Sequence, residues 1–356
     1  MIANYYISKD ASIYSKSQSM NAGIDEVLEI AKTVNADATK NYARTLIYFD
    51  WASIYNELTG SFSTFKTQFD ADGVDYKLKM FSTKPENIKY SYTIEAAILQ
   101  ESWENGIGRT DHTPQTEEGV SWAFRDASGS TNWNTGSLGG HIFTSAVSLA
   151  TQSFEFEDTD INMDISSSVM VIHAGSTNGI LLRFSSSLED NSLDYGTLRF
   201  FSRDTNTIYA PKLQIGWDDS VYSTGSLSPA SSDEILIYVK NNKYEYNEKE
   251  IVRFEIRARD IYTTQTYASS SAALDVLYLP TGSFYSIKDA ETEEDIISFN
   301  DNYTKISCTS SGNFFNVSMK ALQPERLYKI VFKVNNRNYD GQVEHFDANH
   351  FFKVVR

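Results

Sequence analysis

The chain has 356 residues, of which 41% are hydrophobic and 13% aromatic, so it can bury folded cores and is too long for one ordinary β-sandwich. Its formal net charge of −16 repels phosphate backbones and disfavours nucleic acid as a partner. No apolar run reaches the length of a membrane span, no secretory signal is visible, and the single Cys308 cannot form an internal disulfide. We therefore expect a protein without a membrane partner that folds in a reducing cytosol.

Residues 1 to about 140 contain short strand-forming runs separated by polar turns. The alternation in the run that begins at Tyr76 places Tyr76, Leu78 and Met80 on one face, as in a half-buried strand. The segment from Trp51 to Thr59 is compatible with one or two helical turns. Further strands are expected at residues 10–14, 27–30, 44–50 and 90–100.

The stretch from Trp103 to Gly140 differs from its surroundings. It holds Trp103, Trp122 and Trp133 among Gly, Ser, Thr and Asn, which indicates long ordered loops pinned by tryptophans. Exposed rings would serve another use, because aromatic side chains stack on sugar rings and anchor partner proteins. Trp122 and Trp133 are therefore the candidate contacts for a glycan or a partner.

Residues 141 to about 218 contain the strongest local strand signal. An Asn178-Gly179 turn beside the run Ile180 to Arg183, followed by the run Thr197 to Ser202, predicts a pair of antiparallel strands. The segment Ile165 to His173 is the one plausible helix here. Because neither of these two regions supplies enough strands for both sheets, we expect residues 1–217 to share one sandwich, with a loop insertion at about 103–153.

The remainder of the chain predicts a second sandwich. A stretch with Ser, Gly and Pro at residues 218–233 is typical of a linker. Seven short strands at regular spacing then predict an immunoglobulin-like or fibronectin-like sandwich over 234–336. These strands are expected at residues 234–240, 251–258, 273–279, 284–287, 303–308, 314–321 and 328–334. Residues 337–356 form either a last hairpin or an arm that adds a strand to a neighbouring subunit.

The order of runs in residues 10–217 resembles the DNRLRE-type β-sandwich. The resemblance implies a jelly-roll-like module related in shape to carbohydrate-binding domains. The runs that carry it are Asp10 to Tyr14, Asn21-Ala22-Gly23 with Leu28 to Ile30, Arg44 to Asp50, Ser102-Trp103-Glu104, and Met163-Asp164-Ile165 through Asn178-Gly179 to Leu182. The long insertion between Trp103 and Phe154 departs from the pattern.

Two further resemblances follow. The segment Leu322-Gln323-Pro324 with Tyr328 is similar to the corner of fibronectin-type sandwiches, where a tyrosine hydroxyl ties a loop across the sheets. The whole chain resembles virion structural proteins of contractile-tailed marine (cyanophage-like) bacteriophages, in phrases such as Ser19 to Asp25, Phe200 to Thr205 and Gln323 to Arg326. This implies a particle component made in the host cytoplasm, oligomeric and in contact with other virion proteins.

Candidate chemistry is sparse. The acidic run that contains Asp158, Asp160 and Asp164 offers hard oxygen ligands that could hold Ca²⁺, and its alternative reading is a solvated acidic face. No catalytic residues and no cofactor are expected, because the five histidines are dispersed and no nucleophile motif or phosphate-cradling loop is present.

The sequence thus predicts an all-β protein with an N-terminal jelly-roll-like sandwich and a C-terminal immunoglobulin- or fibronectin-like sandwich. The expected function is that of a non-enzymatic structural subunit of a phage virion, at the neck, collar, tail or baseplate periphery. The alternative is a carbohydrate-binding adhesin or fibre domain that contacts a glycan on the host surface.

Overall fold

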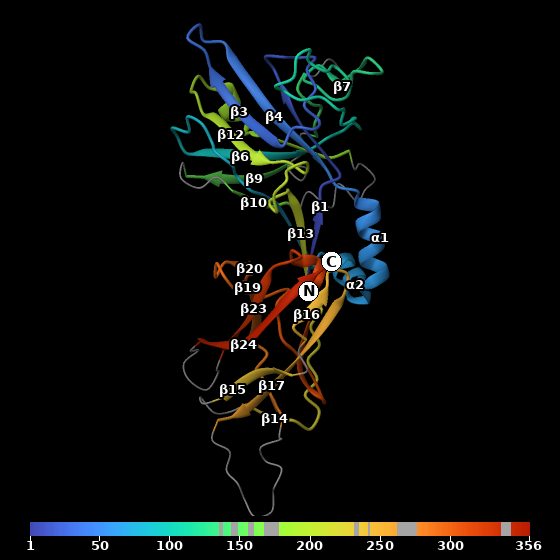
Figure 1. The fold of residues 1–356 in the computed structure, drawn as a ribbon, viewed down its shortest axis with the longest axis vertical. Coiled ribbons are helices and arrows are strands. Elements are labelled where there is room, and N and C mark those ends of the chain that lie inside the picture. The colour runs from blue at the N-terminus through green and yellow to red at the C-terminus, as the bar shows by residue number, and fades with distance from the viewer. Residues whose placement is uncertain are drawn as a thin grey trace, which may run out of the picture. The chain divides into compact units, whose positions relative to one another are not determined.

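The predicted all-β class is confirmed by the structure, a computed structural model in which sheets form the cores and helices are few (Figure 1). It describes residues 1–134, 138–143, 149–155, 160–166, 178–230, 235–240, 243–261, 276–335 and 343–356. In these ranges, no helix combines the length and the apolar character that crossing a bilayer requires.

The chain forms two compact units, each built from separate stretches of sequence. Unit 1 comprises Met1–Asn4, Phe62–Val74 and Ile215–Arg356, and unit 2 comprises Tyr5–Ser61 and Asp75–Gln214. Three stretches that the sequence analysis assigned to 1–217 thus fold with the C-terminal part: 1–4, 62–74 and 215–217. The reason lies in helix α2 (Ser63–Asp70), where Phe65 is buried in unit 1 and packs edge-on against Trp217 at 5.2 Å between ring centroids.

Unit 2 is built around a seven-stranded sheet in the order β12-β3-β4-β11-β6-β9, with β2 paired to β4. In the same unit, β5 pairs antiparallel with β10. The strands are β2 (Lys9–Tyr14), β3 (Val27–Val34), β4 (Lys40–Tyr48), β5 (Val74–Met80), β6 (Tyr92–Ile98), β7 (Phe124–Asp126), β8 (Thr131–Asn132), β9 (Leu149–Phe154), β10 (Ile161–Asp164), β11 (Ile180–Phe184) and β12 (Gly196–Phe201). Strands β1 (Ile2–Tyr6), β13 (Lys212–Trp217) and β5 each contain a point where the chain passes from one unit to the other.

The predicted pairing of the two runs near Asn178 is wrong. Both runs are strands, but β11 lies between β4 and β6, and β12 pairs with β3. The short helix α4 (Ser186–Asp190) separates them, so they are not the arms of a hairpin. The Asn-Gly signal is local, whereas these strands take partners far away in the sequence.

Two local predictions for unit 2 are confirmed. Tyr76, Leu78 and Met80 of β5 are all buried, as their alternation requires. The segment after Asp50 is helical as expected, although helix α1 (Trp51–Ser61) is longer than the one or two turns predicted; it buries a stripe of Trp51, Ile54 and Leu58. Asp50 caps this helix by accepting a hydrogen bond from the Ser53 N–H at 3.2 Å. The helix expected at 165–173 lies largely outside the described residues.

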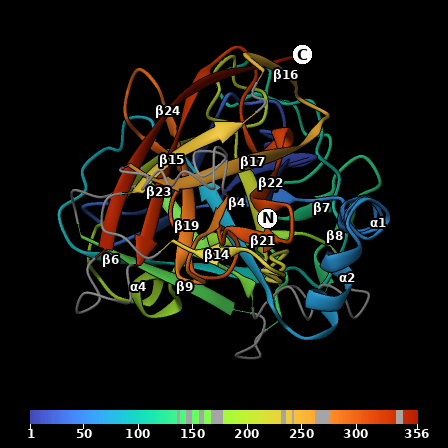
Figure 2. The same cartoon turned by 90° about the horizontal axis from the view of Figure 1, so that it is seen from below.

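Unit 1 contains two sheets, drawn from yellow to red in Figure 1 and seen from below in Figure 2. One has the order β14-β18-β17-β22-β21 with β15 paired to β17, and the other the order β16-β24-β23-β19-β20. The elements are β14 (Ser228–Pro229), β15 (Ile235–Lys240), β16 (Glu245–Asn247), β17 (Ile251–Asp260), β18 (Leu277–Tyr278), β19 (Ser283–Asp289), β20 (Asp295–Ile297), β21 (Ser307–Thr309), β22 (Gly312–Ser318), the 3₁₀ helix η4 (Met319–Ala321), β23 (Leu327–Asn335) and β24 (Val343–Val355).

The core of unit 1 is a sandwich of these two sheets. Phe254 of β17 and Phe315 of β22 stack at 5.2 Å, and Tyr285 of β19 in the other sheet stacks on Phe315 at 4.0 Å. All three belong to one continuous buried cluster that also takes in Phe332 of β23. Alternate side chains of both sheets therefore interdigitate, as in a β-sandwich.

The tyrosine corner expected at Tyr328 is present. The Tyr328 hydroxyl donates to the Gln323 carbonyl oxygen and accepts from the Gln323 N–H, both at 2.8 Å. At the end of the chain, β24 pairs antiparallel with β23 of the same chain. This pairing agrees with the hairpin, one of the two alternatives for residues 337–356.

The stretch expected as a linker is bound into unit 1. Lys305 pairs with Asp218 at 2.6 Å, the Ser223 N–H donates to the Cys308 carbonyl oxygen at 2.9 Å, and the Tyr222 hydroxyl donates to the Leu279 carbonyl oxygen at 2.5 Å. Ser, Gly and Pro indicate irregular backbone here, but its polar groups are fixed by tertiary hydrogen bonds.

Candidate functional site

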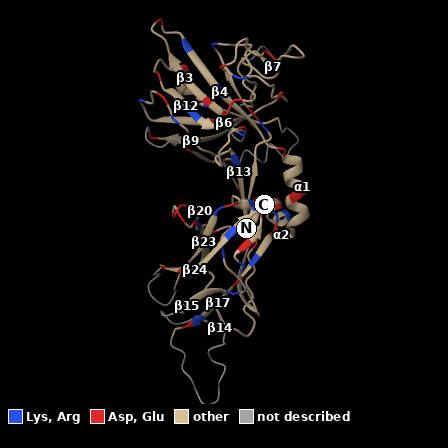
Figure 3. Ribbon diagram, viewed as in Figure 1, with Lys and Arg blue, Asp and Glu red and all other residues tan. Residues whose placement is uncertain are grey.

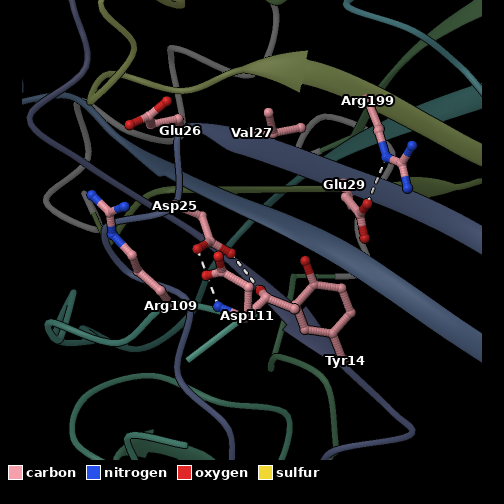
Figure 4. A pocket seen from close by; sticks show the side chains of 9 residues that line it. Tyr14, Asp25, Glu26, Val27, Glu29, Arg109, Asp111 and Arg199 are labelled. Carbon is pink, nitrogen blue, oxygen red and sulfur yellow. Dashed lines mark hydrogen bonds and ion pairs between the residues drawn. The ribbon is translucent and has the colours of Figure 1, made fainter. Parts of the chain in front are cut away.

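A cavity of about 340 Å³ opens in unit 2 beside the start of β3 (Figure 4). We call it the β3 cavity. The charged and aromatic side chains around it are those of Tyr14, Asp25, Glu26, Glu29, Arg109, Asp111 and Arg199. Its size falls at the lower end of the range for small-ligand pockets.

Strand alternation explains how β3 contributes to this cavity. Leu28 and Ile30 are buried in the core, so Glu29 lies on the opposite face. Arg199 of β12 stands directly across from Glu29 in the ladder, and its Nε lies 2.8 Å from Glu29 Oε1. Arg199 Nη1 also contacts Glu86 Oε1 at 2.5 Å, and the hydrogen bonds to Glu29 and then Glu86 raise the pKa of Arg199. This wall is a fixed cross-strand ion pair.

On the other side of the cavity, Asp25 is hydrogen-bonded to Thr110 in the loop that carries Arg109 and Asp111. Its Oδ1 accepts the Thr110 N–H at 3.1 Å, and its Oδ2 accepts the Thr110 hydroxyl. Burial is the largest cause that raises the pKa of Asp25, and the hydrogen bonds from Thr110 oppose it. Asp111 adds a like charge that raises the same pKa further. Arg109 opposes this shift, so the charges of Asp111 and Arg109 partly cancel at Asp25.

Asn21 and Asn105 lock the loop that carries Arg109 and Asp111. The Asn21 amide donates to the carbonyl oxygens of Asn105 and Val120, both at 2.8 Å, and its Oδ1 accepts the Gly108 N–H at 2.7 Å. Gly106 has a φ of +77°, and a Cβ there would lie 2.4 Å from Asn21 Oδ1. The loop is thus preformed, because no other residue fits so close to this side chain.

The two tryptophans predicted to contact a glycan or a partner are buried. Trp122 and Trp133 are 6% and 1% exposed and belong to one cluster with Trp103. Trp122 stacks on Tyr42 at 6.1 Å, with the Arg44 guanidinium 4.9 Å from its ring. The prediction that these two rings are exposed contacts is therefore corrected. They pin the 103–133 loops instead, which was the other interpretation of the sequence.

The calcium candidates are only partly described. Asp160 Oδ1 accepts the Ser82 N–H at 2.7 Å, which links two distant segments. Asp164 Oδ1 accepts the Ser166 N–H at 2.9 Å, which closes a local turn. Asp158 lies outside the described residues. Across the part of the chain that the structure describes, no group of three His, Cys, Asp or Glu side chains is placed to hold a metal.

A smaller cavity of about 210 Å³ lies elsewhere in unit 2, beside Lys9, Tyr48 and Trp103. Lys9 Nζ lies 5.8 Å from the centre of the Tyr48 ring and donates to the Trp103 carbonyl oxygen at 3.2 Å. Its cation is therefore already held by groups of the protein itself.

The β3 cavity was not predicted from the sequence. Its residues come from four separate segments. The runs that hold Tyr14, Asp25, Glu29 and Arg199 were singled out as strands or as parts of a resemblance, but not as a site. The Asn21-Ala22-Gly23 motif was the available signal, because Asn21 organises the cavity loop. Chemically, carboxylates, guanidiniums and a phenol can bind hydroxyl groups or pair with a cation.

Comparisons with known proteins do not assign a family. No protein-family model and no curated protein sequence matches the chain. Among solved structures, the adhesin domain of Epf from Streptococcus pyogenes is 10% identical with a TM-score of 0.18, over 97% of this chain and 91% of that one. The FMN-binding β-glucuronidase from Facaelibacterium prausnitzii L2-6 is 8% identical with a TM-score of 0.16, over 99% of this chain and 39% of that one. At such scores neither likeness supports an argument about fold or function.

Proposed function

We propose that the chain is a non-enzymatic structural subunit of a bacteriophage virion, located at the neck, collar, tail or baseplate periphery. It would be made in the host cytoplasm and would act through contacts with other virion proteins. The proposal starts from the full-length resemblance of phrases such as Ser19 to Asp25 to virion proteins of contractile-tailed phages.

The main support for the proposal is that the loop of the β3 cavity is held in shape by groups of the protein itself. Asn21 satisfies groups of the loop backbone internally, and Trp122 and Trp133 lie in the core beneath the neighbouring loops. Such loops keep one shape without a ligand, which suits a part that docks rigidly against neighbours.

The test is immunogold electron microscopy of density-purified particles of the phage that encodes the chain. Serum against the purified chain should label a fixed position at the neck or baseplate, and serum absorbed with the same protein should not. Partially dissociated particles should be labelled as well, so that buried epitopes are exposed. Absence of label on both intact and dissociated particles would contradict the virion assignment.

The β3 cavity favours a second candidate, a carbohydrate-binding adhesin or fibre domain. Carboxylates and guanidiniums beside Tyr14 are groups that hydrogen-bond sugar hydroxyls and pack against a sugar face. A glycan array should then report binding that Asp111→Asn abolishes and that Asp190→Asn, at an exposed residue of helix α4, leaves unchanged. An array without signal would exclude this second candidate. Immunogold label at the distal tips of fibres would favour it over the structural subunit.

A further inference from the structure

The outer face of strands β15 and β17 in unit 1 is positively charged although the chain is strongly acidic. Ile237 and Phe254 point into the core, so the alternate residues of both strands face outward. In the ladder, Tyr238 stands opposite Arg257, and Leu236 stands opposite Arg259. We call this surface the arginine face; it consists of Leu236, Tyr238, Lys240, Arg253, Arg257 and Arg259. Figure 3 marks the charged residues along the ribbon.

Among the described residues, the guanidinium groups of this face have no acidic partners. The carboxylate of Glu255 lies on the same face and pairs with Lys240 at 3.6 Å. Arg253 lies over the Phe314 ring at 3.5 Å, and no ion pair to Arg257 or Arg259 occurs among the described residues. The buried Nε of Arg259 has no hydrogen-bond partner there either. Three guanidiniums thus remain available to an acidic surface.

The composition of the face is that of an interface core. Leu236 and Tyr238 are each 40% exposed beside the guanidiniums. Tyrosine and arginine are enriched among the residues that dominate binding energy at interfaces. Within the described part of the sheet, β15 takes β17 as its strand partner.

The β3 cavity in unit 2 carries the complementary charge. Glu29 is neutralised by Arg199, but Glu26 and Asp111 have no cationic partner among the described residues and are exposed. Asp25 adds a third carboxylate, and Arg109 is the other cation at the cavity. A space of about 340 Å³ admits a long cationic side chain.

We propose that the arginine face of one copy docks on the β3 cavity of a second copy, so that copies associate head to tail. The inference rests on the proposed role as an assembly subunit. Both complementary surfaces are present on one chain, so a second copy fits better than an unrelated acidic partner. The net charge of −16 opposes association at long range, but at 0.15 M salt charges are screened beyond about 8 Å, whereas contacting pairs persist. A contact between two different patches extends into chains or closes into rings.

The test uses sedimentation velocity of the full-length chain at 0.15 M salt. Wild type should increase in average mass with concentration. Arg257→Gln with Arg259→Gln should weaken self-association at least tenfold, and so should Glu26→Gln with Asp111→Asn. Lys249→Gln and Asp190→Asn, which change exposed charges elsewhere in units 1 and 2, should associate like wild type. Thermal melting of every variant checks that it is folded.

Mixing the two double variants provides the decisive measurement. Each retains one intact surface, so an equimolar mixture should form a 1:1 dimer and nothing larger. A wild type that stays monomeric up to about 1 mM would overturn the proposal, since weaker contacts fall outside the affinity of specific assembly. Loss in only one variant, or a mixture that stays monomeric, would also overturn it. Because these measurements use the isolated chain, their failure is distinguishable from a failure of particle labelling.

Discussion

Asp10 is a carboxylic acid that unit 2 holds almost completely out of water, at 1% exposure. Burial is the largest cause that raises its pKa to about 7, although the Arg203 N–H donates to Oδ2 at 2.8 Å and opposes the shift. The unfolded chain therefore loses this proton near pH 4, whereas the folded chain keeps it until about pH 7. The folded state binds more protons in that window, so stability falls as the pH rises through it.

We predict that Asp10→Asn removes this part of the pH dependence. The unfolding free energy of wild type minus that of the variant should decrease by a few kcal/mol, at about 1.4 kcal/mol per pH unit, between pH 4 and pH 7. Urea unfolding of both proteins across this range measures the difference, and groups common to both cancel. A difference that is constant with pH would show that Asp10 is ionised at its ordinary pKa.

The second prediction concerns the buried hydroxyl of Tyr328 in unit 1. Tyr328→Phe keeps the packing of the ring but leaves the N–H and carbonyl of Gln323 without the hydroxyl that both contact at 2.8 Å. We expect a loss of about 1–3 kcal/mol in unfolding free energy. Tyr244→Phe, at 61% exposure, is the matched control and should change little. Equal effects of the two changes would argue against the corner as a stabilising contact.

At the scale of elements, Asn21 connects the segment before β3 to the loop of the β3 cavity. Asn21→Ala would leave two carbonyl oxygens and the Gly108 N–H without their partner in a site of 0% exposure. We predict a loss of at least about 3 kcal/mol, because each buried group left unsatisfied costs about 1–3 kcal/mol.

Hydrogen exchange provides the local readout for the same variant. The amides of residues 105–120 should exchange faster than in wild type, whereas those of β23 in unit 1 should not change. Ser19→Ala, which removes one exposed hydrogen bond to Glu117 in the same segment, serves as the control. Faster exchange throughout the chain would indicate global destabilisation instead of a released loop.

A buried ion network joins β4, β6, β11 and α4. Arg44 contacts Glu189 at 2.7 Å and Arg183 contacts Glu95 at 2.6 Å, with Arg183 also 3.5 Å from Glu189. The four side chains are between 8% and 14% exposed. Removing one carboxylate leaves a buried guanidinium with too little negative charge around it.

Glu189→Gln should therefore cost about 3–5 kcal/mol in unfolding free energy. Glu86→Gln breaks the contact with Arg199 instead, where the two side chains are 51% and 30% exposed, and should cost less than about 1 kcal/mol. Chemical denaturation of the two variants compares them directly. Similar losses of unfolding free energy in the two variants would show that burial does not strengthen the contribution of the network.

At the scale of the whole molecule, the net charge of −16 destabilises any compact form through self-repulsion. Raising NaCl from about 20 mM to 150 mM shortens the Debye length to about 8 Å and should stabilise the dilute chain by about 1 kcal/mol, or about 2–4 °C in Tm. KCl should act equally if the effect is screening. A Tm that falls with salt would show that attractive ion pairs outweigh the repulsion.

Local rules explain which features could be predicted. The alternation of Tyr76, Leu78 and Met80 and the spacing from Gln323 to Tyr328 depend on neighbours within a few residues. Helix α2 was missed, because its Phe65 is explained only by its contact with Trp217, far along the chain. The β3 cavity was missed for the same reason, since residues from four segments form its walls.

The sequence by itself determined the all-β class, most strand positions and the tyrosine corner, because side-chain period and turn chemistry are local properties. Only the tertiary structure decided the partners of β11 and β12, the discontinuous make-up of the two units, and the burial of Trp122 and Trp133. It also decided that the cationic residues of β17 share one outward face in an acidic chain. These features depend on contacts between residues distant in sequence, whose free energies no local pattern encodes.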